Sequence, residues 1–342
     1  MLMVIFGAGA SYDSVARLRG VAEPCRPPLA DELFEARPIF MPVMKIFGRC
    51  RAVVPYLQRS GVSVEQELAK IAEQAKQFSP ASCELLAIQL YLREALYVCE
   101  RDWADRHIGV TNYATLVREI ERWRLATGEQ VCFVTFNYDT MLETAMQEVL
   151  RFQIVDMDTY ISKRSPYRVI KLHGSVDWWR AVEGYVCPEN SMDTFIDDAP
   201  ILNISNHFRR FKTQRTLHLD GAVVAPAIAI PVHKKDQFAC PQEHVEELAR
   251  IIPHVTKIIT IGWRSSEDLF VNMLRSRLTG LTLKIDLMIV SGDKKGADET
   301  FCNLGIEVSG NRYAHVTSGF SGAVLDDRGM LNALLYQSPW QA

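Results

Sequence analysis

The chain has 342 residues, a formal net charge of −3 and 48% hydrophobic residues. This balance is typical of a globular protein with room for one large domain or two modest ones. Its weak acidity, without a long basic run, gives no electrostatic footprint for nucleic acid, so we expect no direct nucleic-acid partner. No apolar stretch approaches the roughly 20 residues that a membrane helix needs. The first apolar run also lacks a basic leader, so we expect a cytoplasmic protein without a membrane segment.

The eight cysteines are scattered along the chain, and no Cys-x-x-Cys pair occurs. Zinc ribbons are built from such pairs, so the sequence predicts no metal site. Single cysteines inside apolar segments usually behave as small buried hydrophobic residues. We therefore expect a reducing compartment.

The first element is an apolar run over residues 2–6, which predicts a buried strand. It ends in a glycine turn, Gly7-Ala8-Gly9-Ala10-Ser11. Glycines where a strand turns into a helix let backbone N–H groups approach a phosphate closely. This turn lacks the third glycine of the usual dinucleotide pattern, and tight turns use glycine for other reasons. Nucleotide binding and a plain tight turn are therefore both open at this point.

Helical spacing of apolar residues dominates the next part of the chain, from about residue 43 to 125. Leu85, Ile88, Leu92 and Leu96 share one helix face, and Gly128 ends the helical region. The pattern predicts a helical insertion over residues 30–128, between the first and second strands.

A second buried strand follows at 131–136 and ends at Asn137, with a helix predicted from Tyr138 to Leu150. Asn137 fits two interpretations. It caps this helix, with Asp139 favouring the helix N-terminus, or its amide positions a ribose hydroxyl or a water.

A short strand is predicted near residues 153–156, and the buried strand after it ends at His173, directly before Gly174. A histidine at the end of a parallel strand is placed for chemistry, because α/β folds bind ligands at that edge. A lone histidine is nevertheless more often structural. The remaining histidines lie in helix or loop contexts without a paired partner and receive no role: His107, His207, His218, His233, His244, His254 and His315.

Residues 176–240 are less regular and predict a small module within a single domain, 1–342. Two further strands follow, one at 257–261 ending at Gly262 and one at 283–290 ending at Ser291. Between them, Ser265 and Asp268 have the spacing of a helix capping box. The predicted fold class is α/β: a Rossmann-like parallel sheet with a helical insertion after the first strand and a smaller irregular module.

Four of these segments, in this order, resemble the sirtuin-like domain, and more closely its bacterial anti-phage branch. They are Gly7-Ala8-Gly9-Ala10-Ser11, Thr135-Phe136-Asn137-Tyr138-Asp139, Lys171-Leu172-His173-Gly174-Ser175 and Ile261-Gly262-Trp263-Arg264-Ser265. In that branch the middle motif tends to read Thr-x-Asn-Tyr-Asp, and the histidine motif Leu-His-Gly-Ser is followed by Trp, here Trp178 and Trp179. The chain departs from it at Trp263-Arg264, where Tyr-Ser or a similar pair is usual. It also lacks the paired-cysteine zinc module of the protein deacylases.

The resemblance implies NAD as the substrate and assigns roles to particular residues. The glycine loop with Ser11 would hold the diphosphate, and His173 would be the catalytic base. Asn137, the second predicted catalytic residue, and Asp139 would line the nicotinamide-ribose pocket. Gly262, Trp263 and Ser291 would lie along the adenosine half.

The predicted reaction is hydrolysis of NAD to nicotinamide and ADP-ribose, serving anti-phage defence by NAD depletion. The missing zinc module favours NAD cleavage over deacylation. Because unrestrained cleavage would kill the host, we expect gating by homo-oligomerisation or by a separately encoded partner, such as a HerA-type ATPase or a short Argonaute. Two alternatives are an NAD-dependent protein deacylase or ADP-ribosyltransferase, and a non-catalytic subunit that senses NAD or ADP-ribose.

Overall fold

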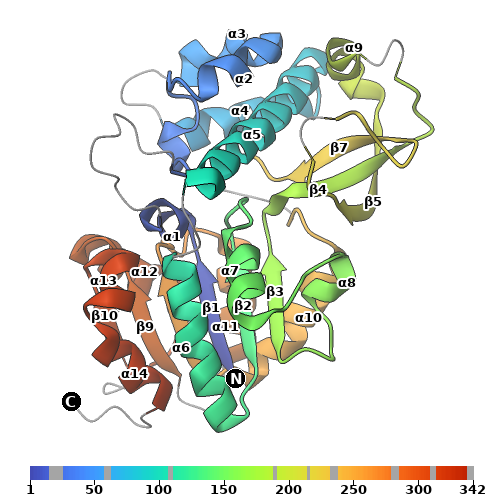
Figure 1. Ribbon diagram of the computed structural model, residues 1–342. Helices are drawn as coiled ribbons and strands as arrows, with labels where there is room; N and C mark the ends of the chain where they lie inside the picture. Colours follow the sequence, from blue (N-terminus) through green and yellow to red (C-terminus); the bar gives the residue numbers. More distant parts are fainter. Residues whose placement is uncertain are drawn as a thin grey trace.

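The computed structural model describes residues 1–14, 26–57, 63–106, 111–187, 191–213, 216–231, 238–278, 285–308 and 313–336. Cys25, His107 and His233 lie outside these ranges. The described residues form a large lobe around a parallel sheet and a small lobe above the carboxyl edge of that sheet (Figure 1).

The large lobe is built on a six-stranded sheet in which every pairing is parallel. Its strands are β1 (Leu2–Phe6), β2 (Val131–Thr135), β3 (Tyr167–Lys171), β8 (Lys257–Ile261), β9 (Asp286–Val290) and β10 (Tyr313–Val316). Their order across the sheet is β3-β2-β1-β8-β9-β10. Counted along the chain, this is the order 3-2-1-4-5-6 of the dinucleotide-binding Rossmann sheet. The predicted α/β, Rossmann-like fold class is confirmed.

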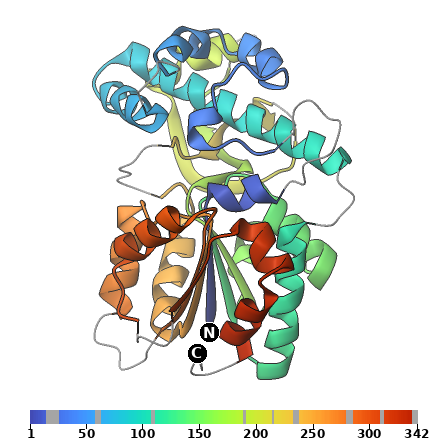
Figure 2. The ribbon, with the colours of Figure 1, turned by 90° about the vertical axis from the view of Figure 1, so that its left-hand side faces the viewer.

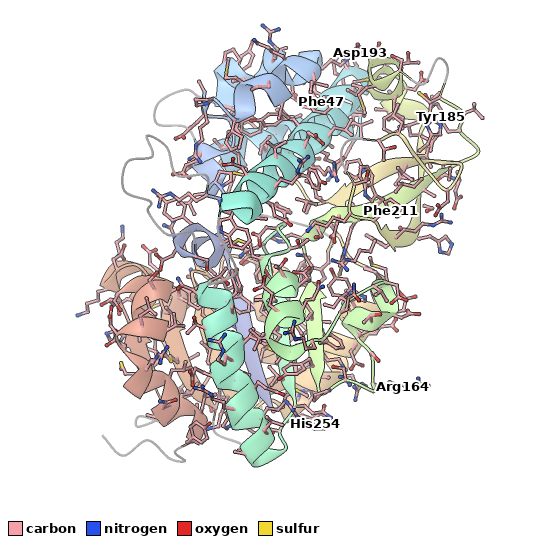
Figure 3. All side chains as sticks on the ribbon, viewed as in Figure 1. Phe47, Arg164, Tyr185, Asp193, Phe211 and His254 are labelled. Carbon is pink, nitrogen blue, oxygen red and sulfur yellow. The ribbon has the colours of Figure 1, made fainter. Side chains whose placement is uncertain are left out.

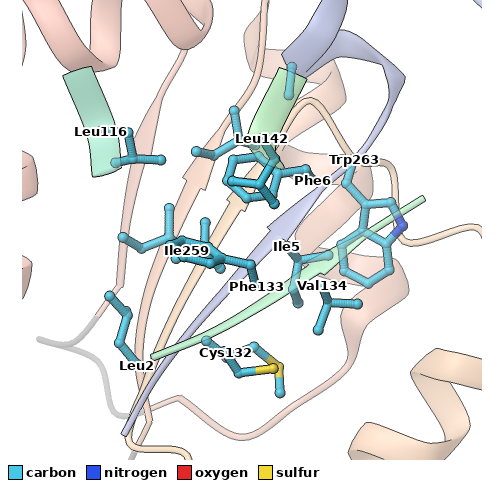
Figure 4. Close-up of a cluster of buried hydrophobic side chains, with 14 of the residues drawn as sticks. Leu2, Ile5, Phe6, Leu116, Cys132, Phe133, Val134, Leu142, Ile259 and Trp263 are labelled. Atoms are coloured by element: carbon cyan, nitrogen blue, oxygen red, sulfur yellow. The ribbon is translucent and has the colours of Figure 1, made fainter. Parts of the chain in front are cut away.

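Helices cover both faces of this sheet, which explains why its central strands are apolar throughout rather than alternating. One face carries α6 (Asn112–Thr127), α7 (Met141–Leu150), α13 (Gly319–Leu325) and α14 (Arg328–Tyr336); the other carries α10 (Gln242–Ile251), α11 (Asp268–Leu278) and α12 (Lys294–Leu304) (Figure 2). Figure 4 shows the resulting core, where Leu116 and Leu142 from the first face approach Phe6 and Phe133 of the sheet. Helix α6 falls within the range predicted for the insertion, but its packing places it in the large lobe.

The small lobe combines two segments that are far apart in the sequence. The first contributes η1 (Ala30–Glu32), α2 (Phe40–Ile46), α3 (Gly48–Leu57), α4 (Val64–Ala75) and α5 (Ser79–Arg106). The second contributes β4 (Gly174–Glu183), α9 (Met192–Asp197), η3 (Ala199–Ile201), β5 (Asn203–Arg210), β6 (His218–Leu219) and β7 (Ala222–Ile228). The strands form an antiparallel sheet in the order β5-β4-β7-β6. Phe47 and Leu86 share one buried cluster with Phe195 and Val223, so the insertion and the irregular module complete each other's core.

The chain crosses between the lobes where β3 runs directly into β4. Gly174 opens β4 with a positive φ of 79°, and a Cβ there would lie 1.9 Å from the Ala227 carbonyl oxygen. The preceding residue, His173, accepts a hydrogen bond from the Ala229 amide through its own carbonyl, at 2.9 Å. Only glycine fits at the point where the chain crosses between the lobes. The His173 backbone is held by Ala229, the residue that follows β7.

Three further observations concern the described residues alone. No helix among them is both long enough and apolar enough to cross a bilayer. No three His, Cys, Asp or Glu side chains in these ranges cluster as metal ligands would. The cysteines that the structure describes are free thiols, all buried except Cys302.

Candidate active site

The residues predicted to bind or cleave a nucleotide lie along one edge of the parallel sheet. Three strands are followed directly by a predicted site residue: β1 by Gly7, β8 by Gly262 and β9 by Ser291. Asn137 and His173 lie two residues beyond the ends of β2 and β3. These strands end level with one another, because the last residue of β1 pairs with the last residues of both β2 and β8. Segments from residue 7 to residue 291 thereby become neighbours. The chain leaves β1 and β8 in opposite directions across the sheet, and open α/β sheets bind ligands at such a switch point.

The glycine loop after β1 is joined to the loop after β8. The Gly9 amide donates to the Gly262 carbonyl at 3.1 Å. Gly262 has a positive φ of 57°, and a Cβ on it would lie 2.4 Å from the Ala10 nitrogen. A Cβ on Gly7 would likewise lie 2.4 Å from the Gly262 oxygen. The glycines therefore serve close packing of two loops, and Ala8 between them is exposed.

Asn137 holds this loop from below. Its side-chain nitrogen lies 2.9 Å from the Gly7 carbonyl oxygen, 2.9 Å from the Ser11 hydroxyl and 3.1 Å from the Tyr113 hydroxyl, so its two N–H groups are shared among these three oxygens. Because a carbonyl oxygen can only accept, the Gly7 contact fixes which amide atom is the nitrogen. The interpretation of Asn137 as a helix cap is wrong, since α7 begins at Met141 with Thr140 as its N-cap. Ser11 is 1% exposed, so its hydroxyl lies beneath the loop and not at its surface.

Tyr113 completes this network, and nothing in the sequence distinguishes it from an ordinary core aromatic residue. It lies in the first turn of α6, its ring centroid 5.0 Å from that of Phe6 and its hydroxyl 3.0 Å from the Ser11 oxygen. Burial raises the pKa of the Tyr113 phenol well above its ordinary value, and the nearby Asp139 adds to this. Tyr113 is therefore a neutral phenol that fixes Ser11 and Asn137.

Asp139 and Lys171 fasten the loop between β2 and α7. The Asp139 carboxylate accepts the Met141 amide at 3.1 Å, so Asp139 rather than Asn137 meets the start of α7. Burial raises the pKa of Asp139, while the cation of Lys171 acts in the opposite direction. Lys171 is fully buried; its ammonium donates to the Asp139 carbonyl and lies 3.0 Å from a Glu143 oxygen. The lysine that precedes the histidine motif thus holds the neighbouring loop.

A row of aromatic rings lines the site from β3 to β8. The His173 imidazole stands edge-on to Phe136 with centroids 4.9 Å apart, and Tyr138 lies 6.1 Å away on a nearly parallel plane. Phe136 stacks in turn on Trp263 at 5.4 Å and 10°. The Trp263 indole donates to Glu267. Trp263 is 4% exposed and His173 7%, so Trp263 forms a wall and His173 presents only a small surface.

Ser265, in the loop after β8, has two unusual properties. It is a non-glycine residue with a positive φ of 54°, and its hydroxyl is buried without a hydrogen-bond partner among the described residues. The predicted capping box is wrong, because α11 begins only at Asp268 and the Ser265 hydroxyl bonds no helix amide in that part of the chain. Strained backbone and unsatisfied polar groups cluster at ligand sites. The neighbouring Arg264 side chain is exposed.

Ser291 occupies the outer part of the edge. Its amide donates to the Val316 carbonyl and its carbonyl accepts the Gly319 amide, both at 2.9 Å. The residue is partly exposed, and β8 separates it from the glycine loop. The edge therefore extends from His173 to Ser291 across five adjacent strands.

Two cavities formed by described residues lie elsewhere. One, of about 380 Å³, is lined by α8 (Met157–Tyr160), the end of β5, and Leu219; Figure 3 shows Phe211 of this cavity at the side of the molecule. The other, of about 490 Å³, lies at the amino edge of the sheet near Met1 and His254. Neither is lined by the predicted site residues.

No protein-family model and no curated protein matches this chain. Among solved structures, the chain is similar to a mutant Sir2 homologue in complex with 2′-O-acetyl-ADP-ribose. That similarity has 13% identity and a TM-score of 0.46 and covers 98% of this chain and 94% of the other. A Sir2 structure with a p53 peptide and NAD+ is similar at 14% identity and a TM-score of 0.38, over 96% and 94% of the two chains. Similarities of this size concern the chain path alone.

Proposed function

We propose that this protein hydrolyses NAD+ to nicotinamide and ADP-ribose. The observation that carries the proposal is that the glycine loop, Asn137 and His173 lie along one edge of a 3-2-1-4-5-6 sheet, the edge at whose switch point dinucleotides bind in folds of this order. The converging segments are also those whose sequences, in the same order, resemble the NAD-cleaving sirtuin-like domain.

The leaving group in NAD+ cleavage determines which catalytic groups the site needs. When the bond between nicotinamide and C1′ of the ribose breaks, the electron pair goes to the pyridine nitrogen, and nicotinamide leaves neutral. No general acid is needed, in contrast to ordinary glycoside hydrolysis. The site has to stabilise positive charge on the ribose and hold a water against C1′. We assign His173 as the base that accepts the proton of this water, because imidazole accepts protons readily near neutral pH.

The other residues position the dinucleotide. The nitrogen of Asn137 is committed to the glycine loop, so its amide oxygen is the atom that we assign to a ribose hydroxyl or the water. Asp139 would border the nicotinamide-ribose pocket, and the loop from Gly7 to Ser11 would face the diphosphate with its backbone. Gly262, Trp263 and Ser291 would lie along the adenosine half. No step in this scheme uses a metal.

We further propose that the activity is gated, in the service of anti-phage defence by NAD depletion. His173 is 7% exposed and Asn137 6%, which supports a resting state that is closed to substrate. Opening would follow homo-oligomerisation or binding of a separately encoded partner. The resemblance points to a HerA-type ATPase or a short Argonaute.

The test is NAD+ consumption by the purified protein, alone and with the product of its neighbouring gene, with nicotinamide quantified by chromatography. We expect His173→Ala to abolish cleavage while it retains NAD+ binding and cooperative unfolding. Two results would overturn the proposal. Consumption that requires an acylated peptide would identify a deacylase, and saturable binding with intact NAD+ would identify a sensor.

A further inference from the structure

One face of α5 carries a stripe of polar residues, Gln89, Arg93 and Glu100. Because an α-helix has about 3.6 residues per turn, residues four and eleven positions apart lie on nearly the same side. The stripe faces β7, β4 and the start of α7, and each of its members bonds a different one of these segments.

Gln89 bonds the strand that fixes the histidine. Its side-chain nitrogen donates to the Ile228 carbonyl at 3.2 Å. Ile228 pairs with Gly174 in the small sheet, and the next residue, Ala229, donates to the His173 carbonyl at 2.9 Å. A displacement of α5 at Gln89 would therefore act on the backbone of His173 and Gly174.

Arg93 bonds the start of β4. Its Nε donates to the Val176 carbonyl at 2.8 Å, and its guanidinium lies 4.5 Å from the centroid of Trp179. The Val176 amide donates in turn to the Tyr138 carbonyl at 2.9 Å. Arg93 is 1% exposed, and Glu94 pairs with it at 2.9 Å. The Arg93 guanidinium thus connects α5 directly to β4, the strand that follows His173. Through Val176 it is also connected to the loop that carries Asn137.

Glu100 bonds the start of α7. Its carboxylate accepts the Thr140 amide at 3.0 Å and also the Thr140 hydroxyl. Thr140 is the N-cap of α7, so a carboxylate from the small lobe satisfies the helix terminus that follows Asn137 and Asp139. Lys212, also from the small lobe, lies 3.4 Å from Glu100. Asp139 is the other charged group that acts on this carboxylate.

The opposite side of α5 packs against the helices of the insertion. It contacts α2, α3 and α4, and the Tyr91 hydroxyl donates to the Leu33 carbonyl at 2.8 Å. Phe34 stacks on Tyr91 at 5.4 Å. One straight element therefore lies between the insertion and the three segments that hold the site.

We infer that Gln89, Arg93 and Glu100 are positioning residues through which the helical insertion sets the geometry of the site. A partner or a second copy that shifts α2–α4 acts on His173 and on the loop from Asn137 to Thr140 together, by way of α5. In its catalytic readout, this inference rests on the proposed NAD+ hydrolysis.

The experiment compares Glu100→Gln and Glu100→Ala with Glu84→Gln. Glu84 lies on α5, nine residues before Arg93 and so on the opposite side of the helix, which makes it a matched control. Kinetics of NAD+ cleavage, thermal unfolding, and hydrogen exchange of the peptides that contain residues 137–141 and 173–176 are measured for each variant. Glu100→Gln keeps an acceptor for Thr140 and guards against a failure of Glu100→Ala to fold.

We expect Glu100→Gln to lower kcat about tenfold with little change in KM, and Glu100→Ala to lower kcat further. The reason is that the loop from Asn137 to Thr140 would no longer be held in position relative to His173. Exchange increases in both peptides, and Glu84→Gln matches the wild type. Reduced thermal stability with unchanged kcat and unchanged exchange at 173–176 would overturn the inference. If the wild type leaves NAD+ intact, the proposed function fails, and the exchange data alone decide the role of α5.

Discussion

The amide of Gly9 donates to the carbonyl of Gly262 across 3.1 Å, so two loops that begin some 250 residues apart form one surface. The three glycines of this contact allow one main chain to lie directly on another.

Gly262→Ala combines a left-handed backbone with a Cβ placed 2.4 Å from the Ala10 nitrogen. We expect it to lower the free energy of unfolding by about 2–4 kcal/mol and to abolish nucleotide binding. Denaturant unfolding and calorimetric titration with NAD+ measure the two effects. Gly292→Ala is the control for stability, because a Cβ there meets no atom within 4 Å. Equal stability of the two variants would show that the loops do not pack as described.

Tyr113→Phe removes one hydroxyl from the network beneath the glycine loop, while Asn137 keeps its bond to the Gly7 carbonyl. We expect a loss of about 1 kcal/mol in the free energy of unfolding. Asn137→Asp is nearly isosteric but replaces the donor nitrogen by a carboxylate oxygen that faces the Gly7 carbonyl. We therefore expect a larger decrease in the free energy of unfolding than for Tyr113→Phe, and no NAD+ cleavage. Tyr336→Phe, on an exposed tyrosine, is the control and leaves both quantities unchanged. Wild-type cleavage by Asn137→Asp would remove this residue from the site.

Substitution of Ser265 is expected to affect protein stability and affinity for NAD+ in opposite directions. Ser265→Gly relieves the positive φ of 54° and deletes a buried hydroxyl that has no partner among the described residues. We expect the free energy of unfolding to rise by about 1 kcal/mol while affinity for NAD+ falls. Ser265→Ala deletes the hydroxyl but keeps the strain, so it separates the two contributions. A gain in stability without any loss of affinity would mean that the hydroxyl does not serve the ligand.

Glu100 makes stability depend on pH in a defined direction. Burial raises the pKa of its carboxyl above the ordinary value of 4.5, against the opposing effects of Lys212 and Thr140. The folded state then holds this proton more tightly than the unfolded state does. The contribution of Glu100 to the free energy of unfolding therefore decreases as the pH rises from 4.5 through the folded-state pKa, and it increases again on acidification.

The measurement is urea denaturation of the wild type and of Glu100→Gln across this pH window. The difference between the two isolates Glu100 from other carboxylates, such as Glu247, whose pKa is lowered by its arginine partners. We expect the wild type to gain stability relative to Glu100→Gln as the pH falls. A difference that does not change with pH would contradict the raised pKa.

Strands and their ends could be predicted from the sequence, because a buried parallel strand is a short apolar run and its end is a change to glycine or polar residues. Strand β10 was not predicted; it is four residues long and alternates between buried and exposed positions at the sheet edge. The strand predicted near residues 153–156 is wrong, because this segment is irregular chain between α7 and α8. The segment that forms the small sheet was predicted to be irregular. Register shifts between Gly174 and Trp179 and between Arg180 and Val182 interrupt the alternation of its side chains between the two faces of the sheet.

The candidate site was predictable only where it is formed by strand ends. Asn137 and His173 follow strands, and the structure brings them to one edge. Tyr113, Lys171 and Glu100 could not be identified, because helical or strand periodicity reports that a residue is buried but not which residue it meets. The assignment of α6 to the insertion failed for the same reason: its apolar face fits either lobe, and only tertiary packing shows that it covers β1 and β2.

The placement of β1 at the centre of the sheet sets the order of events during synthesis. Strand β1 cannot be paired on both sides until residues 131–135 and residues 257–261 have been made. The insertion likewise lacks part of its core until residues 176–230 have been made. Because the Gly7–Gly9 turn packs against Gly262, the turn cannot take its final shape before residue 262 has been made. Under the proposed function, NAD+ cleavage would therefore be absent from nascent chains that end before this residue.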